Sequence, residues 1–136
     1  MKENLVHYRT CVCNINYHMV WSVKYRKKII TPEIEEFLRK TAIQIGEDKG
    51  FTVQLFEAGE RDHIHCFITA PPKLSITNIA KYLKGITGRK LFEEYPELRN
   101  KLWNGELWNH SYYVETIGSI SEENIKKYIE KQDKAY

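Results

Sequence analysis

Two histidines separated by one residue, His63 and His65, form the first group that could carry out chemistry. Residues 63–70 read as a strand, in which successive side chains alternate between two faces. The residues that alternate with the histidines are apolar, so both imidazoles would lie on the opposite, open face and could reach one divalent ion. Surface histidines beside a turn are the alternative, since H-x-H is common by chance. His18 and His110 could support such a site, although lone histidines are more often structural.

Tyr128 and Gln132 form a second group, four residues apart and therefore on one face of a predicted C-terminal helix. The simpler interpretation makes Tyr128 a half-buried helix residue beside Ile125 and Ile129, which leaves Gln132 no role beyond solvation. In the alternative, Gln132 offers its amide oxygen to a metal held by the two histidines. Tyr128 then presents a nucleophilic phenol one helical turn away.

These four side chains would together suit the cleavage of a phosphodiester in DNA. A phenol has a pKa of about 10 and is a weak nucleophile at neutral pH. A Mg²⁺ or Mn²⁺ ion on a non-bridging phosphate oxygen would neutralise charge and orient the phosphate for in-line attack. Attack by Tyr128 would leave a phosphotyrosine and a free hydroxyl. Because one ester replaces another, the strands could be rejoined without ATP.

Basic residues and tryptophans supply candidates for DNA contacts. One basic cluster comprises Lys24, Arg26, Lys27 and Lys28, and the other comprises Lys81, Lys84, Arg89 and Lys90. Phosphate contacts from either would give an affinity that falls with salt, and a solvated face is an equally good interpretation. Trp103 and Trp108 could stack on unpaired bases, but we favour a role as anchors that bury their loop.

Seven predicted elements must position these groups. Strands are predicted over 14–24, 51–57, 63–70 and 111–117, and helices begin after the N-caps Thr31, Ser75 and Ser121. Gly50 would end the first helix, Gly85 and Gly88 would weaken the second towards its end, and 100–110 reads as a loop. The first six elements match an α+β, ferredoxin-like (RRM-like) antiparallel sheet with helices on one face. The last helix, which carries Tyr128, must lie elsewhere.

Length and composition predict one globular domain over residues 1–136. A hydrophobic content of 42% supports a real core and excludes disorder as the default state. The net charge of +3 permits a nucleic-acid partner without requiring one. The three cysteines are an odd number, and neither a secretory signal nor an apolar stretch of about 20 residues is present, so we expect a reducing cytoplasm.

The ordered set of motifs resembles the HUH-class single-tyrosine transposases of small bacterial insertion sequences (TnpA type, hairpin-recognising). The motifs are YHMVW at 17–21 followed by KYR at 24–26, RDHIH at 61–65, LWNHSY at 107–112 with Val114, and Tyr128-x-x-x-Gln132. By motif position, the resemblance implies metal ligands at His63, His65 and Gln132 and the nucleophile at Tyr128.

The resemblance further implies a homodimeric, Mg²⁺-dependent enzyme of the bacterial or archaeal cytoplasm, associated with the nucleoid during activity. Such an enzyme recognises imperfect DNA hairpins near the ends of its element. It cleaves single-stranded DNA through a 5′-phosphotyrosine link. The resemblance also allows the tyrosine helix to complete the partner subunit's active site instead of its own.

Other functions stay open from the sequence. A non-catalytic nucleic-acid-binding module on the same scaffold would display aromatic residues on its central strands, and the third strand offers only Phe67 on that face. A two-histidine phosphodiesterase would need two H-x-[ST] motifs, which this chain lacks. A rolling-circle replication initiator usually has a longer chain. A domesticated HUH nuclease with a cellular DNA target would share all the motifs.

Overall fold

The structure is a computed structural model that describes residues 5–102 and 105–135, without the side chains of 131–135. The strands are β1 (Val6–His7), β2 (Val12–Cys13), β3 (Asn16–Ser22), β4 (Thr52–Gly59), β5 (His63–Thr69) and β6 (Tyr113–Ile117). The helices are α1 (Pro32–Lys49), α2 (Ile76–Glu94), α3 (Leu98–Lys101) and α4 (Glu122–Ala135), with a 3₁₀ turn, η1, at Lys24–Arg26.

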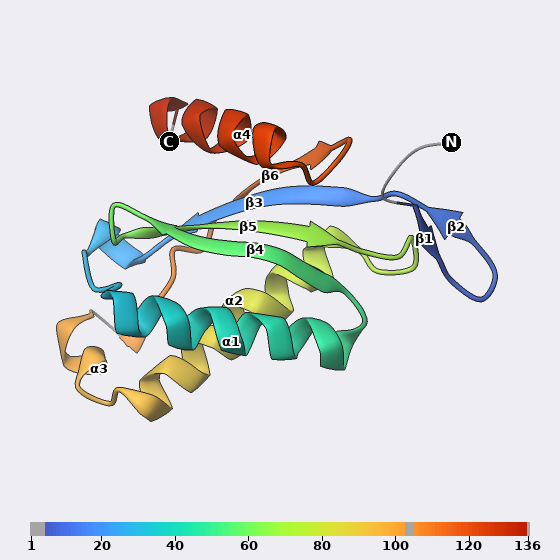
Figure 1. The fold of residues 1–136 in the computed structure, drawn as a ribbon. Coiled ribbons are helices and arrows are strands. Elements are labelled where there is room, and N and C mark those ends of the chain that lie inside the picture. The colour runs from blue at the N-terminus through green and yellow to red at the C-terminus, as the bar shows by residue number, and fades with distance from the viewer. Residues whose placement is uncertain (1–4, 103–104, 136) are drawn as a thin grey trace.

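A four-stranded sheet in the order β4-β5-β3-β6 forms the centre of the fold. Every neighbouring pair is antiparallel, and β1 and β2 form a separate hairpin. Helices α1 and α2 cover one face, and α4 lies over the other (Figure 1). This is the predicted ferredoxin-like arrangement with an added C-terminal helix, so the predicted fold class is confirmed.

The predicted helix starts are confirmed by their capping hydrogen bonds. The Oγ1 of Thr31 accepts from the N–H of Ile34 at 3.2 Å, and Pro32 occupies the first position of α1. The hydroxyls of Ser75 and Ser121 likewise accept from the N–H three residues later. Gly50 ends α1 with a left-handed φ of 91°.

α2 continues past Gly85 and Gly88 to Glu94, and its last turns bury Leu91 and Phe92. Two local features differ from the predictions. A short helix, α3, occupies part of the predicted loop. The β1–β2 hairpin was not predicted, since two-residue strands are too short to show an alternating pattern.

The two faces of the sheet have different compositions. Met19, Trp21 and Ile64 are fully buried on the α1 and α2 side and belong to the hydrophobic core. On the α4 side, His18 and His65 are buried instead. Within residues 5–102 and 105–135, no helix is both long and apolar enough to cross a membrane. The buried imidazoles of His18 and His65 therefore lie on the face that the last helix covers.

Candidate active site

The two histidines lie at the start of β5 on the α4 side of the sheet. His63 pairs with Ser22 of β3, and His65 pairs with Val20. Their ring centroids are 5.0 Å apart, with the ring planes at 71°. Their exposed fractions are 3% and 1%, so the face predicted to be open is covered. The predicted side-by-side placement of the imidazoles is observed.

Asp62 fixes the orientation of the His63 ring. Its Oδ1 lies 2.8 Å from the Nδ1 of His63, and its two carboxylate oxygens also accept from Arg26 at 3.2 Å and Lys28 at 3.4 Å. Burial acts to raise the pKa of Asp62, but the hydrogen bonds it accepts outweigh burial and hold that pKa below its usual value. Two of the cations predicted to contact DNA thus support the carboxylate behind His63.

Gly59 makes room for the same ring from the neighbouring strand. Gly59 pairs with His63 across β4 and β5, so a side chain at Gly59 would point to the same face. A Cβ at this position would overlap the Nε2 of His63. The absence of a side chain at Gly59 is therefore a condition for the observed ring position.

We expect Gly59→Ala to displace the His63 ring and lower Mn²⁺ affinity by about tenfold, which is typical of a lost support for a metal ligand. Overpacking should also lower the free energy of unfolding by about 1–3 kcal/mol. Gly118→Ala is the matched control, because a Cβ there meets no atom within 4 Å. Calorimetric titration and thermal unfolding measure the two effects. Equal Mn²⁺ affinity in both variants would contradict this role of Gly59.

His18 of β3 connects His65 to the last helix. The Nε2 of His18 lies 3.1 Å from the Nδ1 of His65, and the His18 ring stacks on Phe67 with centroids 4.3 Å apart. The Tyr128 ring meets His18 edge-on, with centroids 6.0 Å apart. One fully buried imidazole therefore touches both a proposed metal ligand and the proposed nucleophile. These contacts give His18 a more central place than a lone histidine in a strand indicates.

We expect His18→Phe to lower the rate of covalent adduct formation by about 10- to 100-fold, the usual effect of losing a support for a metal ligand. The variant keeps a ring to stack on Phe67 but removes the hydrogen bond to His65. The tautomer ratio of His65, measured by nitrogen NMR of the metal-free protein, should then change, because the hydrogen bond at its Nδ1 is lost. A wild-type tautomer ratio in the variant would contradict this role.

The histidine pair fits a divalent metal ion. The Nδ1 of each ring is engaged, by Asp62 in His63 and by His18 in His65, so each imidazole would bind a metal through Nε2. Among the residues whose side chains are described, no third His, Cys, Asp or Glu joins them in a metal-binding group. Gln132 lies in α4 one turn after Tyr128, and its side chain is outside the described residues.

The predicted DNA-contact residues lie in varied environments. Lys24 pairs with Glu106 at 3.1 Å, and the Nζ of Lys27 donates to a backbone carbonyl at 2.6 Å. Lys90 is exposed, and Trp103 lies outside the described residues. The Trp108 indole is 7% exposed and donates to the Oγ1 of Thr87 at 3.0 Å, as expected of an anchor. Contacts of these residues with DNA stay predictions.

Comparison with a family model and with known proteins indicates the same family in each case. The family model described as IS200-like transposase matches residues 11–132. The ISDra2 transposase TnpA of Deinococcus radiodurans is 37% identical over 124 residues, which cover 91% of this chain and 88% of that protein. The transposase for insertion sequence element IS200 of Salmonella typhimurium is 33% identical over 132 residues, which cover 96% of this chain and 83% of that protein.

Solved structures show the same similarity. A crystal structure of a transposase from Deinococcus radiodurans R1 superposes with a TM-score of 0.76 at 31% identity, covering 93% of this chain and 97% of that chain. A REP-associated tyrosine transposase bound to a REP hairpin superposes with a TM-score of 0.55, covering 90% of this chain and 67% of that chain. At 16% identity, the second match shows a shared fold alone.

Proposed function

Because the chain belongs to the IS200-like transposase family, we propose that it cleaves and rejoins single-stranded DNA at the ends of an insertion sequence. Family membership supports a DNA-cleaving and strand-transferring enzyme. The roles of individual residues and the phosphotyrosine intermediate are proposed from the motif positions, together with the contacts among His65, His18 and Tyr128.

The proposal is carried by the contact of Tyr128 with His18, which in turn lies within hydrogen-bonding distance of His65. These contacts bring the last helix to a pair of histidines more than 60 residues earlier in the chain. An ordinary amphipathic helix needs no tyrosine packed against buried polar side chains on its covered face. A nucleophile beside a proposed metal site needs this placement.

Tyr128 is the proposed nucleophile. Its Oη forms a bond to phosphorus as the bond from phosphorus to the 3′ oxygen breaks, so the 5′ phosphate becomes linked to the tyrosine. The phenolic proton passes to solvent, and the departing 3′ oxygen takes up a proton to become a 3′-hydroxyl. In the reverse step, a 3′-hydroxyl attacks the phosphotyrosine and releases Tyr128, so no external energy source is required.

His63, His65 and Gln132 are the proposed ligands of a Mg²⁺ or Mn²⁺ ion. When bound, such an ion would neutralise charge on the phosphate and orient it. The chain's own contribution is to hold the two imidazoles. Asp62 and Gly59 set the ring of His63, while His18 sets the ring of His65.

The DNA partner and the assembly complete the proposal. Recognition of a DNA hairpin is part of the proposal, because the motifs of this chain resemble those of hairpin-recognising single-tyrosine transposases. We also propose a homodimer, in which the tyrosine helix serves its own site or the partner's, and a cytoplasmic, nucleoid-associated location. The proposed DNA contacts are Lys24, Arg26, Lys27, Lys28, Lys84, Arg89, Lys90 and Trp108.

Incubation with labelled single-stranded DNA from the flanks of the encoding gene tests the function directly. We expect a covalent protein–DNA adduct on a denaturing gel in the presence of Mg²⁺, together with a fragment that ends in a 3′-hydroxyl. A scrambled oligonucleotide of the same composition is the control. A reversible mobility shift without any adduct would contradict the proposal and favour a non-catalytic binding module.

A further inference from the structure

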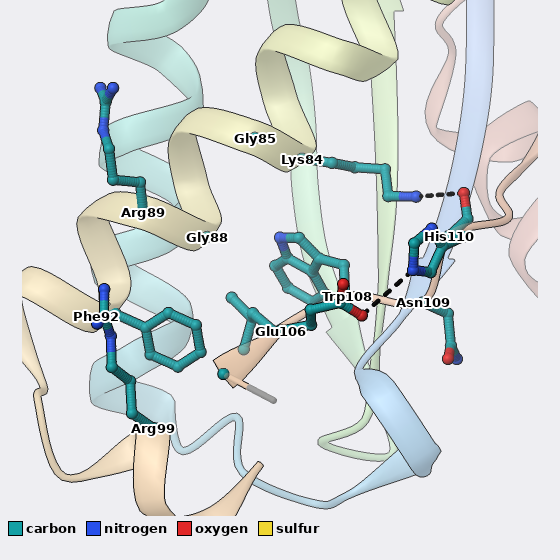
Figure 2. A pocket seen from close by; sticks show the side chains of 12 residues that line it. Lys84, Gly85, Gly88, Arg89, Phe92, Arg99, Glu106, Trp108, Asn109 and His110 are labelled. Atoms are coloured by element: carbon teal, nitrogen blue, oxygen red, sulfur yellow. Dashed lines mark hydrogen bonds and ion pairs between the residues drawn. The ribbon is translucent and has the colours of Figure 1, made fainter. Parts of the chain in front are cut away.

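A hollow lies between the second half of α2 and residues 105–110, on the side of the sheet that α1 and α2 cover (Figure 2). Its volume is about 450 Å³. We propose that it binds one nucleotide of the DNA strand, adjacent to the phosphate that is cleaved. This inference rests on the proposed function and names a binding site for part of the same substrate.

Two glycines give the hollow its shape. Gly85 and Gly88 are three residues apart on α2 and both line the hollow, and Gly88 lies against the indole of Trp108 (Figure 2). A Cβ at Gly85 would meet no atom within 4 Å, and one at Gly88 would lie 3.7 Å from the Cδ1 of Trp108. Glycine inside a helix costs about 0.5–1 kcal/mol relative to alanine, so helix stability does not explain the pair. The open position is at Gly85, whose absent side chain leaves space for a flat ring against the helix backbone, whereas Trp108 already packs against Gly88.

The charge of the hollow suits a phosphate. Lys84, Arg89 and Arg99 lie along its wall, and the one carboxylate among its described lining residues is Glu106. Glu106 is already paired with Lys24 at 3.1 Å. Arg89 lies 3.9 Å from Glu93, but Lys84, Arg89 and Arg99 still outnumber the two nearby carboxylates. The net charge at the hollow is therefore positive, as recognition of a DNA backbone requires.

Lys84 holds the hollow in its observed form. Its Nζ donates to the backbone carbonyls of His110 at 2.9 Å and Ser111 at 3.3 Å, which ties the loop to α2 (Figure 2). Trp108 adds a second tie through its hydrogen bond to Thr87. The wall formed by the loop is thus fixed before DNA binds, which reduces the ordering cost of binding.

Asn109 connects the hollow to the histidines. Its Nδ2 donates to the Oγ of Ser22 at 2.6 Å, and its backbone N–H donates to the Ser22 carbonyl at 2.9 Å. Ser22 is the partner of His63 across β3 and β5. One residue at the end of β3 therefore separates the wall of the hollow from the proposed metal site. A DNA strand with the cleaved phosphate at His63 would pass around the Ser22 end of β3. Its neighbouring nucleotide would then lie in the hollow.

Gly85→Leu tests the inference by filling the hollow without removing a charge. Leucine favours helix more than glycine does, so the fold should persist. In a Tyr128→Phe background, we expect about tenfold weaker binding of the cleavage-site oligonucleotide, in line with the loss of one base contact. Thr77→Leu, which adds a leucine at an exposed position of the same helix, is the matched control and should bind like its parent.

An abasic scan of the oligonucleotide identifies the base. We expect removal of one base beside the cleavage point to weaken binding about tenfold in the parent protein and to have little effect in Gly85→Leu. Binding by Gly85→Leu equal to that of its parent would overturn the inference. The inference would also be overturned if removal of each base weakened binding equally in the parent protein and in Gly85→Leu, because the hollow would then contact no base.

Arg89→Gln gives a second test that leaves the hollow open. We expect it to weaken binding several-fold and to reduce the salt dependence of binding by about one ion. Lys40→Gln, an equal loss of charge at an exposed position of α1, should leave binding unchanged. Equal effects of the two substitutions would overturn the phosphate assignment. If the wild-type chain forms no covalent adduct with DNA, the proposed function is wrong. If the wild-type chain forms the adduct but Gly85→Leu and Arg89→Gln bind DNA like their controls, only the proposed nucleotide site is wrong.

Discussion

Tyr128→Phe is expected to form no covalent adduct with single-stranded DNA, a loss of at least about 10³-fold, while binding the same DNA with unchanged affinity. The substitution removes one oxygen atom. The ring that packs edge-on against His18 with centroids 6.0 Å apart is kept, so the position of α4 should be kept as well. A denaturing gel measures the adduct, and fluorescence anisotropy measures binding.

Tyr113→Phe is the matched control for this prediction. Tyr113 lies on the same face of the sheet, opposite Val20 of β3, and its hydroxyl donates to Glu115 at 2.5 Å. It is a second tyrosine on that face and therefore an alternative nucleophile. We expect Tyr113→Phe to form the adduct, and we expect mass spectrometry of the wild-type adduct to find the nucleotide on the peptide that contains Tyr128. An adduct retained by Tyr128→Phe and lost by Tyr113→Phe would reverse the assignment.

The fold could be predicted because local signals agreed with the global arrangement. Thr31, Ser75 and Ser121 cap helices through hydrogen bonds to residues only three positions away, so the sequence contains both partners. The alternation around His63 and His65 places both on one face whichever strand pairs with them. Element order then restricts four strands and two crossover helices to few arrangements.

The role of His18 could not be predicted because it depends on register. His18 and His65 are 47 residues apart, and their contact requires that His18 pair with Phe67 across β3 and β5. A shift of one residue would turn His18 to the opposite face. Spacing along the chain contains no information about that choice, so a lone histidine in a strand gave only a weak signal.

The basic cluster after β3 shows a second limit of sequence reading. Arg26 and Lys28 are close in sequence, which suggested one surface for phosphates. In the structure both contact Asp62, the carboxylate behind His63. Charge pattern identifies cations but not their partners, because an acidic residue from another segment can approach them only after folding. Their proposed DNA contacts would therefore act close to the metal site.

Removal of divalent metal is expected to abolish adduct formation, and Mg²⁺ or Mn²⁺ should restore it. His63→Ala should bind no Mn²⁺ in calorimetric titration, and it should form no adduct at any metal concentration tested. The reason is geometric, since the ring of His63 is fixed by Asp62 and fits against Gly59. Among the residues whose side chains are described, no group of three His, Cys, Asp or Glu offers another metal site. We expect DNA affinity to persist, because no proposed DNA contact is removed.

Two comparisons make the metal prediction specific. His7→Ala removes an exposed imidazole in β1 and should leave both Mn²⁺ affinity and adduct formation unchanged. Gln132→Ala should weaken Mn²⁺ binding, whereas Gln132→Glu keeps an oxygen ligand at the same position and should bind the ion more tightly than Gln132→Ala does. If chelator-treated protein formed as much adduct as untreated protein, the metal site would be contradicted. Tyr128 would then act as a nucleophile with protein groups alone. Equal Mn²⁺ affinity in the two Gln132 variants would instead remove only the third ligand from the proposal.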